Sequence, residues 1–147
     1  MNTKITKRSK AWHVALWIVQ VLLAGVFLMA GWMKTFVPLP ELAETIPMAA
    51  ELPTLTRFIG VSELAGGLGL LLPASLRIFP RLTIAAAYAL GIVMVLALFF
   101  HIFRGEYSAI GTNVVLGLMA FVIAWGRTSK APINSPATLA PEPGVGQ

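Results

Sequence analysis

The chain has 147 residues, of which 57% are hydrophobic and 12% are charged, and its formal net charge is +5. A water-soluble domain of this size could hardly hide so much apolar surface in a single core, so the composition predicts an integral membrane protein. The absence of cysteine excludes dithiol relays, iron–sulfur clusters and thiolate metal sites.

Apolar stretches long enough to cross a bilayer as helices recur along the chain. A transmembrane helix needs roughly 20 mostly apolar residues. The stretches lie at 12–33, 55–72, 82–103 and 107–125. Residues 90–100 read LGIVMVLALFF and are apolar on every face, whereas a strand of a membrane barrel alternates polar and apolar residues. We therefore predict an all-α membrane protein, a bundle of four transmembrane helices with antiparallel neighbours.

The basic residues favour one orientation of this bundle. With a basic cytoplasmic N-terminus at 1–11, eight of the 11 Lys and Arg residues lie inside and three, Lys34, Arg57 and Arg104, lie outside. Cytoplasmic loops of membrane proteins carry an excess of Lys and Arg, so we predict that both termini are cytoplasmic, as in a bacterial inner (plasma) membrane protein. Because this topology accounts for the positive charge, we expect no nucleic-acid partner.

The remaining segments connect or extend the membrane domain, 12–127. Prolines punctuate the segment between the first two spans, where 41–46 suits a short surface helix or a lid, with Leu42 and Ile46 toward the membrane. The connection at 73–81 is short and basic. Residues 128–147 are rich in Pro, Ala and small polar residues, which predicts a disordered cytoplasmic tail.

Glu63 is the most informative single residue because it lies near the middle of an apolar span. A carboxyl group at membrane depth costs on the order of 2.5 to 3.5 kcal/mol to insert, so it is a candidate functional group by default. Gly60, Gly66 and Gly67 share its helix face and would let another helix pack closely. Glu63 should therefore point into the bundle, where protonation, a basic partner or hydrogen bonds must neutralise it.

Each of the other spans contributes one polar side chain in the same outer half of the bundle. Lys34 and His101 are the candidate cations for Glu63, and Asn113 is a candidate hydrogen-bonding neighbour. Each also has a structural interpretation: an anchoring lysine, an interfacial histidine and an amide that joins two helices. Together they predict a polar, ligand-binding pocket, with Glu63 as its possible proton donor or acceptor, and no dedicated metal centre.

The chain resembles the DoxX-like membrane proteins. The resemblance rests on Gly31-x-x-Lys34 in the first span, Glu63-x-x-Gly66-Gly67-x-x-Leu70 in the second, Ala97-x-x-x-His101 in the third and Asn113 in the fourth. It covers about 12–127. It implies a small four-helix inner-membrane protein whose relatives are described as subunits of quinone-linked oxidoreductases, including thiosulfate oxidation, or of membrane redox complexes. Because this chain has no cysteine, electrons would have to pass to a partner or a bound quinone.

Three functions remain open at this point. The chain could be an oxidoreductase-associated subunit that binds a quinone, with a redox partner subunit or a second copy of itself beside it in the bilayer. It could instead bind or transport a small solute or lipid, with Glu63 as a protonation switch. It could also be a non-catalytic membrane scaffold, in which Glu63 only joins helices. Whether the chain is itself an enzyme is not decided by these patterns.

Overall fold

The computed structural model describes the backbone of residues 2–133 and the side chains of residues 10–133. The described chain is helical, and four of its helices are long and apolar enough to cross a membrane. The predicted all-α, four-span fold is therefore confirmed. The long helices are α1 (Asn2–Phe36), α4 (Pro53–Leu76), α5 (Arg81–Arg104) and α6 (Ile110–Ser129). Short helices connect them: α2 (Leu39–Thr45), α3 (Met48–Glu51) and the 3-10 turn η1 (Tyr107–Ala109).

All four long helices extend beyond the spans expected from the sequence, and α1 does so the most, since it begins at Asn2 and not at residue 12. The second span was expected to end before Pro73, but α4 continues through this proline to Leu76 and ends at Arg77, whose left-handed backbone (φ 56°) stops the helix. A proline near a helix end removes only one backbone hydrogen bond, which membrane helices tolerate. The last helix continues to Ser129, so residues 128 and 129 are helical and not part of a tail. Residues 134–147 of the predicted tail lie outside the described residues.

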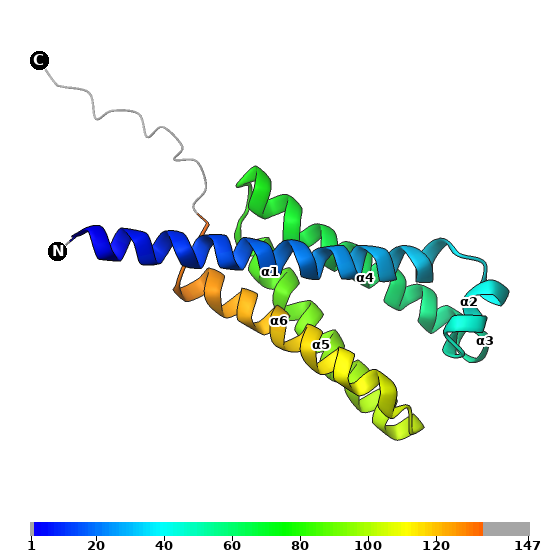
Figure 1. Cartoon of the computed structure of the whole chain (residues 1–147). Helices are drawn as coiled ribbons and strands as arrows, with labels where there is room; N and C mark the ends of the chain where they lie inside the picture. The colour runs from blue at the N-terminus through cyan, green and yellow to red at the C-terminus, as the bar shows by residue number, and fades with distance from the viewer. Residues whose placement is uncertain (1, 134–147) are drawn as a thin grey trace, which may run out of the picture.

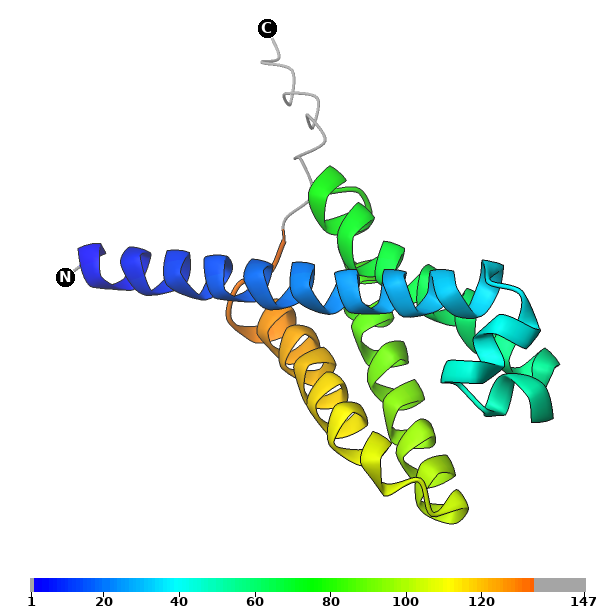
Figure 2. The same ribbon diagram turned by 45° about the vertical axis from the view of Figure 1, so that its right-hand side comes forward.

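The long helices run alternately up and down, in two pairs. α1 packs along α4, and α5 packs along α6, while α4 also contacts α5 and α1 also contacts α6. We call the end that holds the start of α1 and the end of α6 the terminal end, and the end that holds α2, α3 and η1 the loop end. Figures 1 and 2 show that the α5–α6 pair diverges from the α1–α4 pair toward the loop end.

The apolar core lies where all four long helices meet. Its members are Leu23, Ala24, Phe27, Leu70, Ala87, Leu90, Met94, Ala120, Ile123 and Ala124. Many other large apolar side chains point outward and are exposed, which is the arrangement expected of helices that face lipid. The core thus holds the helix pairs together, and lipid covers the remaining apolar surface.

The short helices at the loop end fold over the protein itself. Leu42 of α2 and Ala49 of α3 are each 1% exposed. The expectation that Leu42 faces the membrane is therefore wrong: α2 and α3 pack against one another, and α3 also contacts α4. The sequence correctly predicted a short helix in this segment, since α2 covers most of 41–46. Its apolar face, however, packs against protein and not against lipid.

Candidate functional site

Glu63 and Lys34 form an ion pair between α4 and α1. The ammonium nitrogen Nζ of Lys34 donates to both carboxylate oxygens of Glu63, at 2.6 Å to Oε1 and 2.8 Å to Oε2. The Glu63 side chain is 4% exposed and that of Lys34 is 17% exposed. An acid at membrane depth is thus neutralised by a base that itself lies partly at the surface of the protein.

Glycines bring the two helices close enough for this pair to form. A Cβ atom on Gly31 of α1 would lie 2.7 Å from the carbonyl oxygen of Gly60, and one on Gly60 would lie 2.7 Å from Cβ of Lys34. The stem of Lys34 therefore lies directly on Gly60, and its ammonium group reaches Glu63 one turn further along α4. Of the other predicted packing glycines, Gly67 faces α1 and Gly66 faces α5.

Arg57 fixes the end of α1 that carries Lys34. Its Nη1 donates to the carbonyl oxygen of Lys34 and its Nη2 to that of Val37, both at 2.7 Å. The last carbonyl groups of a helix have no partner within the helix, and the forked guanidinium satisfies two such acceptors. The sequence had indicated Arg57 only as a basic residue of the outer side. Its place in the second turn of α4, beside the expected end of the first span, was the available signal for this role.

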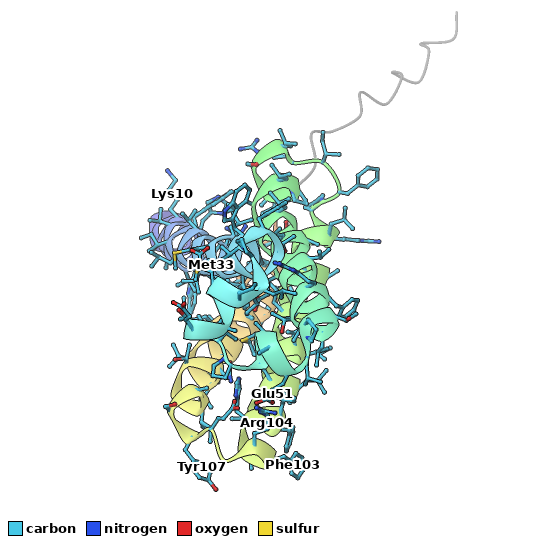
Figure 3. All side chains as sticks on the ribbon, turned by 90° about the vertical axis from the view of Figure 1, so that its right-hand side faces the viewer. Lys10, Met33, Glu51, Phe103, Arg104 and Tyr107 are labelled. Atoms are coloured by element: carbon cyan, nitrogen blue, oxygen red, sulfur yellow. The ribbon has the colours of Figure 1, made fainter. Side chains whose placement is uncertain are left out.

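His101 belongs to a different cluster from Glu63. Its Nδ1 lies 2.6 Å from Oε2 of Glu106, and Arg104 contacts Glu106 at 2.6 Å and Glu51 at 2.7 Å. We call these four residues the loop-end cluster; Figure 3 shows Glu51 of α3 beside Arg104 of α5. Of the two candidate cations, the structure thus pairs Lys34 with Glu63, and it places His101 with Glu106.

Asn113 is buried on α6, in the other helix pair. Its Nδ2 has no hydrogen-bond partner within residues 10–133. Gly66 of α4 lies against Leu90, and Gly117 of α6 lies against Met94, one turn further toward the loop end. α4 and α6 both begin at the loop end, so Glu63 lies about one turn nearer that end than Gly66, and Asn113 about one turn nearer it than Gly117. Asn113 therefore lies about one turn nearer the loop end than Glu63, and within residues 10–133 no hydrogen bond joins it to the Lys34–Glu63 pair.

A second polar network, which the sequence reasoning missed, lies at the terminal end. Arg127 is 1% exposed, and its Nε donates to Oε1 of Gln20 at 3.0 Å. Gln20 in turn donates from Nε2 to the carbonyl oxygen of Leu70 at 2.5 Å. Arg127 had been interpreted only as a cytoplasmic basic residue. The available signal for this network was the polar amide of Gln20 in the terminal half of the first span, because Arg127 lies at the same end of the fourth span.

Within the described part of the chain, no three His or Glu side chains are close enough to share a metal ion. The Lys34–Glu63 pair joins an acid and a base at hydrogen-bond distance, so either partner can hold the proton between them.

These features define a multi-pass helical membrane protein with a Lys–Glu ion pair buried between its first two spans. The model of the DoxX-like family matches residues 18–123, which is most of the chain and includes all four long helices in whole or in part. The protein therefore belongs to the DoxX-like family, as the resemblance had indicated. Neither the curated proteins nor the solved structures include a match to this chain.

Proposed function

We propose that this DoxX-like protein is the membrane subunit of a quinone-linked redox system, and that the Lys34–Glu63 pair handles protons beside the quinone head. One observation carries the proposal: an acid and a base lie 2.6 Å apart at membrane depth, and the base is partly accessible. The pair has no net charge while Lys34 is protonated and Glu63 is ionised, and a proton passed to a ligand leaves it with one negative charge until a proton returns.

Two hydrogen-bond donors fit a ligand that carries carbonyl oxygens. The ammonium group of Lys34 has three N–H bonds, of which two are directed at Glu63, so one remains for a ligand. The buried Nδ2 of Asn113 has no partner within residues 10–133 and lies on the other helix pair, about one turn nearer the loop end than Glu63. A quinone head accepts hydrogen bonds at its two oxygens and has an apolar body suited to the surrounding side chains.

The chain's own contribution would be binding and proton transfer. A bound quinone supplies the capacity to carry electrons and protons together. Lys34 would donate a hydrogen bond from Nζ to the ligand. The carboxylate of Glu63 would accept a proton from the ligand and later return it. Since the chain has no redox group of its own in its side chains, a partner subunit would deliver or remove the electrons.

We place the loop end outside and both termini inside a bacterial plasma membrane.

Quinone binding by the purified protein tests this proposal. An organic extract of the full chain, purified in mild detergent, should contain a quinone, and the depleted protein should bind a short-chain quinone in titration. We expect Glu63→Gln and Asn113→Ala each to weaken binding by about tenfold, the effect of losing one hydrogen bond to a buried polar group. Ser62→Ala is the matched control, because Ser62 is a partly exposed neighbour that bonds only its own helix. An extract without quinone, together with no binding in titration, would overturn the proposal.

A purely structural role is the second candidate, and one observation favours it. Both oxygens of Glu63 are bonded by Lys34, and the surrounding helices touch through glycine, so the pair already serves to fasten α1 to α4. In that case Glu63→Gln lowers the thermal stability in detergent, and the wild-type protein binds no quinone. The same titration therefore separates the two functions.

A further inference from the structure

Arg127 carries a buried positive charge at the terminal end, far from the Lys34–Glu63 pair. Its guanidinium lies 5.2 Å from the ring centre of Trp17, and Nη1 makes long contacts to the carbonyl oxygen of Ala131 (3.4 Å) and to Nδ1 of His13 (3.3 Å). Within residues 10–133 it forms no ion pair, and its Nη2 has no hydrogen-bond partner. A buried guanidinium without a carboxylate is costly unless something else supplies negative charge.

The hydrogen bonds around Arg127 contain more donors than acceptors. His13 is approached by two donors, Nε1 of Trp17 at 3.1 Å from its Nε2 and Nη1 of Arg127 at 3.3 Å from its Nδ1. A neutral imidazole has one acceptor nitrogen and a protonated one has none, so the ring cannot accept from both. The oxygen of Gln20 is already used by Nε of Arg127. The network therefore lacks an acceptor, and an anion is the kind of ligand that provides several.

A cavity of about 320 Å³ opens beside this network. Two of its wall residues, His13 and Trp17, are the same residues that contact Arg127, and a second cation, Arg77, lines it as well. The remaining wall residues are Ala74, Ser75, Pro132 and Ile133. No acidic side chain is among the lining residues, and the volume is at the small end of ligand-binding pockets.

We propose that this cavity binds a phosphate group, carried either by a membrane lipid headgroup or by free phosphate. Phosphate oxygens accept hydrogen bonds and carry negative charge, so the group supplies both things that the network lacks. The fork of Arg77 and the ring of His13 would contact it, and Arg127 would stabilise it from behind His13 and Trp17. The site is separate from the one in the proposed function and does not depend on it.

Titration of the full-length protein in a non-ionic detergent tests the site. The probes are dihexanoyl phosphatidylglycerol and inorganic phosphate, with binding measured by calorimetry. We expect Arg77→Asn to weaken binding by about tenfold, as for a lost charge-assisted hydrogen bond. Asparagine suits this position because it tolerates the left-handed backbone of Arg77. The matched control is Arg81→Asn, which removes an exposed charge of the same end that does not line the cavity.

The outcomes separate the sources of the phosphate. Binding of phosphatidylglycerol alone identifies a lipid headgroup, and binding of inorganic phosphate with similar affinity identifies free phosphate. Absence of binding by both probes overturns the proposal. An equal loss in Arg77→Asn and Arg81→Asn overturns it as well, because that result indicates attraction by the general positive charge of this end. Both variants change exposed residues, so their folding does not limit the test.

Discussion

The energetic role of the Lys34–Glu63 pair depends on which partner is more buried. The Glu63 side chain is 4% exposed, so its charge has no route to water when Lys34 is removed. Lys34 is 17% exposed and near the end of α1, so its long stem can carry the ammonium group to the headgroup level. Losing the base should therefore cost more than losing the acid.

Replacement of one partner at a time tests this asymmetry. Lys34→Met should lower the free energy of unfolding by about 3–5 kcal/mol, because it leaves an uncompensated buried carboxylate. Glu63→Gln should cost clearly less, and the double variant should recover much of the loss of Lys34→Met. Unfolding in mixed micelles by increasing sodium dodecyl sulfate measures all three. Lys10→Met, which removes an exposed lysine of the same helix, is the control. Costs that simply add in the double variant would contradict a coupled pair.

The loop-end cluster predicts a dependence of stability on pH. Hydrogen bonds from Arg104 and then from His101 hold the pKa of Glu106 below its ordinary value of 4.5. A carboxyl group with a lowered pKa in the folded state stabilises the protein above its unfolded pKa, and this contribution is lost as pH falls through the folded pKa. Glu106→Gln should therefore lower the melting temperature at pH 7 and make progressively less difference below about pH 4.5.

Thermal unfolding of the wild type and of Glu106→Gln from pH 7 to pH 3 measures this difference. Glu44→Gln is a suitable control, since Glu44 is exposed and forms no ion pair within residues 10–133. A difference between wild type and Glu106→Gln that stays constant across this range would show that the charge of Glu106 contributes nothing.

At the scale of the helices, contact between α1 and α4 depends on the absence of a side chain at Gly31. A Cβ atom there would lie 2.7 Å from the carbonyl oxygen of Gly60 and 2.8 Å from the backbone nitrogen of Leu64. Backbone atoms cannot rotate aside as a side chain can, so the two helices would have to separate. Their separation would also lengthen the contact between Lys34 and Glu63.

Gly31→Ala should therefore destabilise the protein by about 1–3 kcal/mol, the usual cost of overpacking. Gly25→Ala is the matched control on the same helix, since a Cβ atom at Gly25 meets nothing within 4 Å. That change should be neutral or stabilising by up to about 1 kcal/mol, because alanine favours the helix. Equal effects of the two substitutions on unfolding in micelles would show that α1 and α4 do not pack closely at Gly31.

The long helices could be predicted from the sequence because hydrophobicity and length determine them directly. The partner of Glu63 could not, because the depth of a residue along a helix does not give its lateral position. Lys34 and His101 both lay near the outer rim, and the choice depended on which helices pair. His101 pairs instead with a residue close by in the chain. Gly105, with φ 72°, turns the chain after α5, so that Glu106 contacts the histidine ring. Arg127 was missed because its partners lie about 110 residues earlier in the chain.

At the scale of the whole molecule, the two helix pairs are joined at different places by different forces. The apolar core fastens them where α1, α4, α5 and α6 meet. Toward the loop end the pairs diverge (Figures 1 and 2), and the ion pair of Glu51 with Arg104 connects them there. The proposed quinone site has its two donors, Lys34 and Asn113, on opposite pairs. Access to it would therefore depend on the lateral separation of these pairs.

The charge distribution over the whole molecule predicts which end faces the cytoplasm. Of the 11 Lys and Arg residues, eight lie toward the terminal end, and basic residues are retained on the cytoplasmic side of membranes. The chain has no native cysteine, so single cysteines can report the orientation without background. Ser108 in η1 and Ser129 at the end of α6 are both exposed and lie at opposite ends. In intact cells, a membrane-impermeant maleimide should label Ser108→Cys, and it should label Ser129→Cys only after permeabilisation. The opposite pattern would invert the topology and place the Lys34–Glu63 pair near the cytoplasmic face.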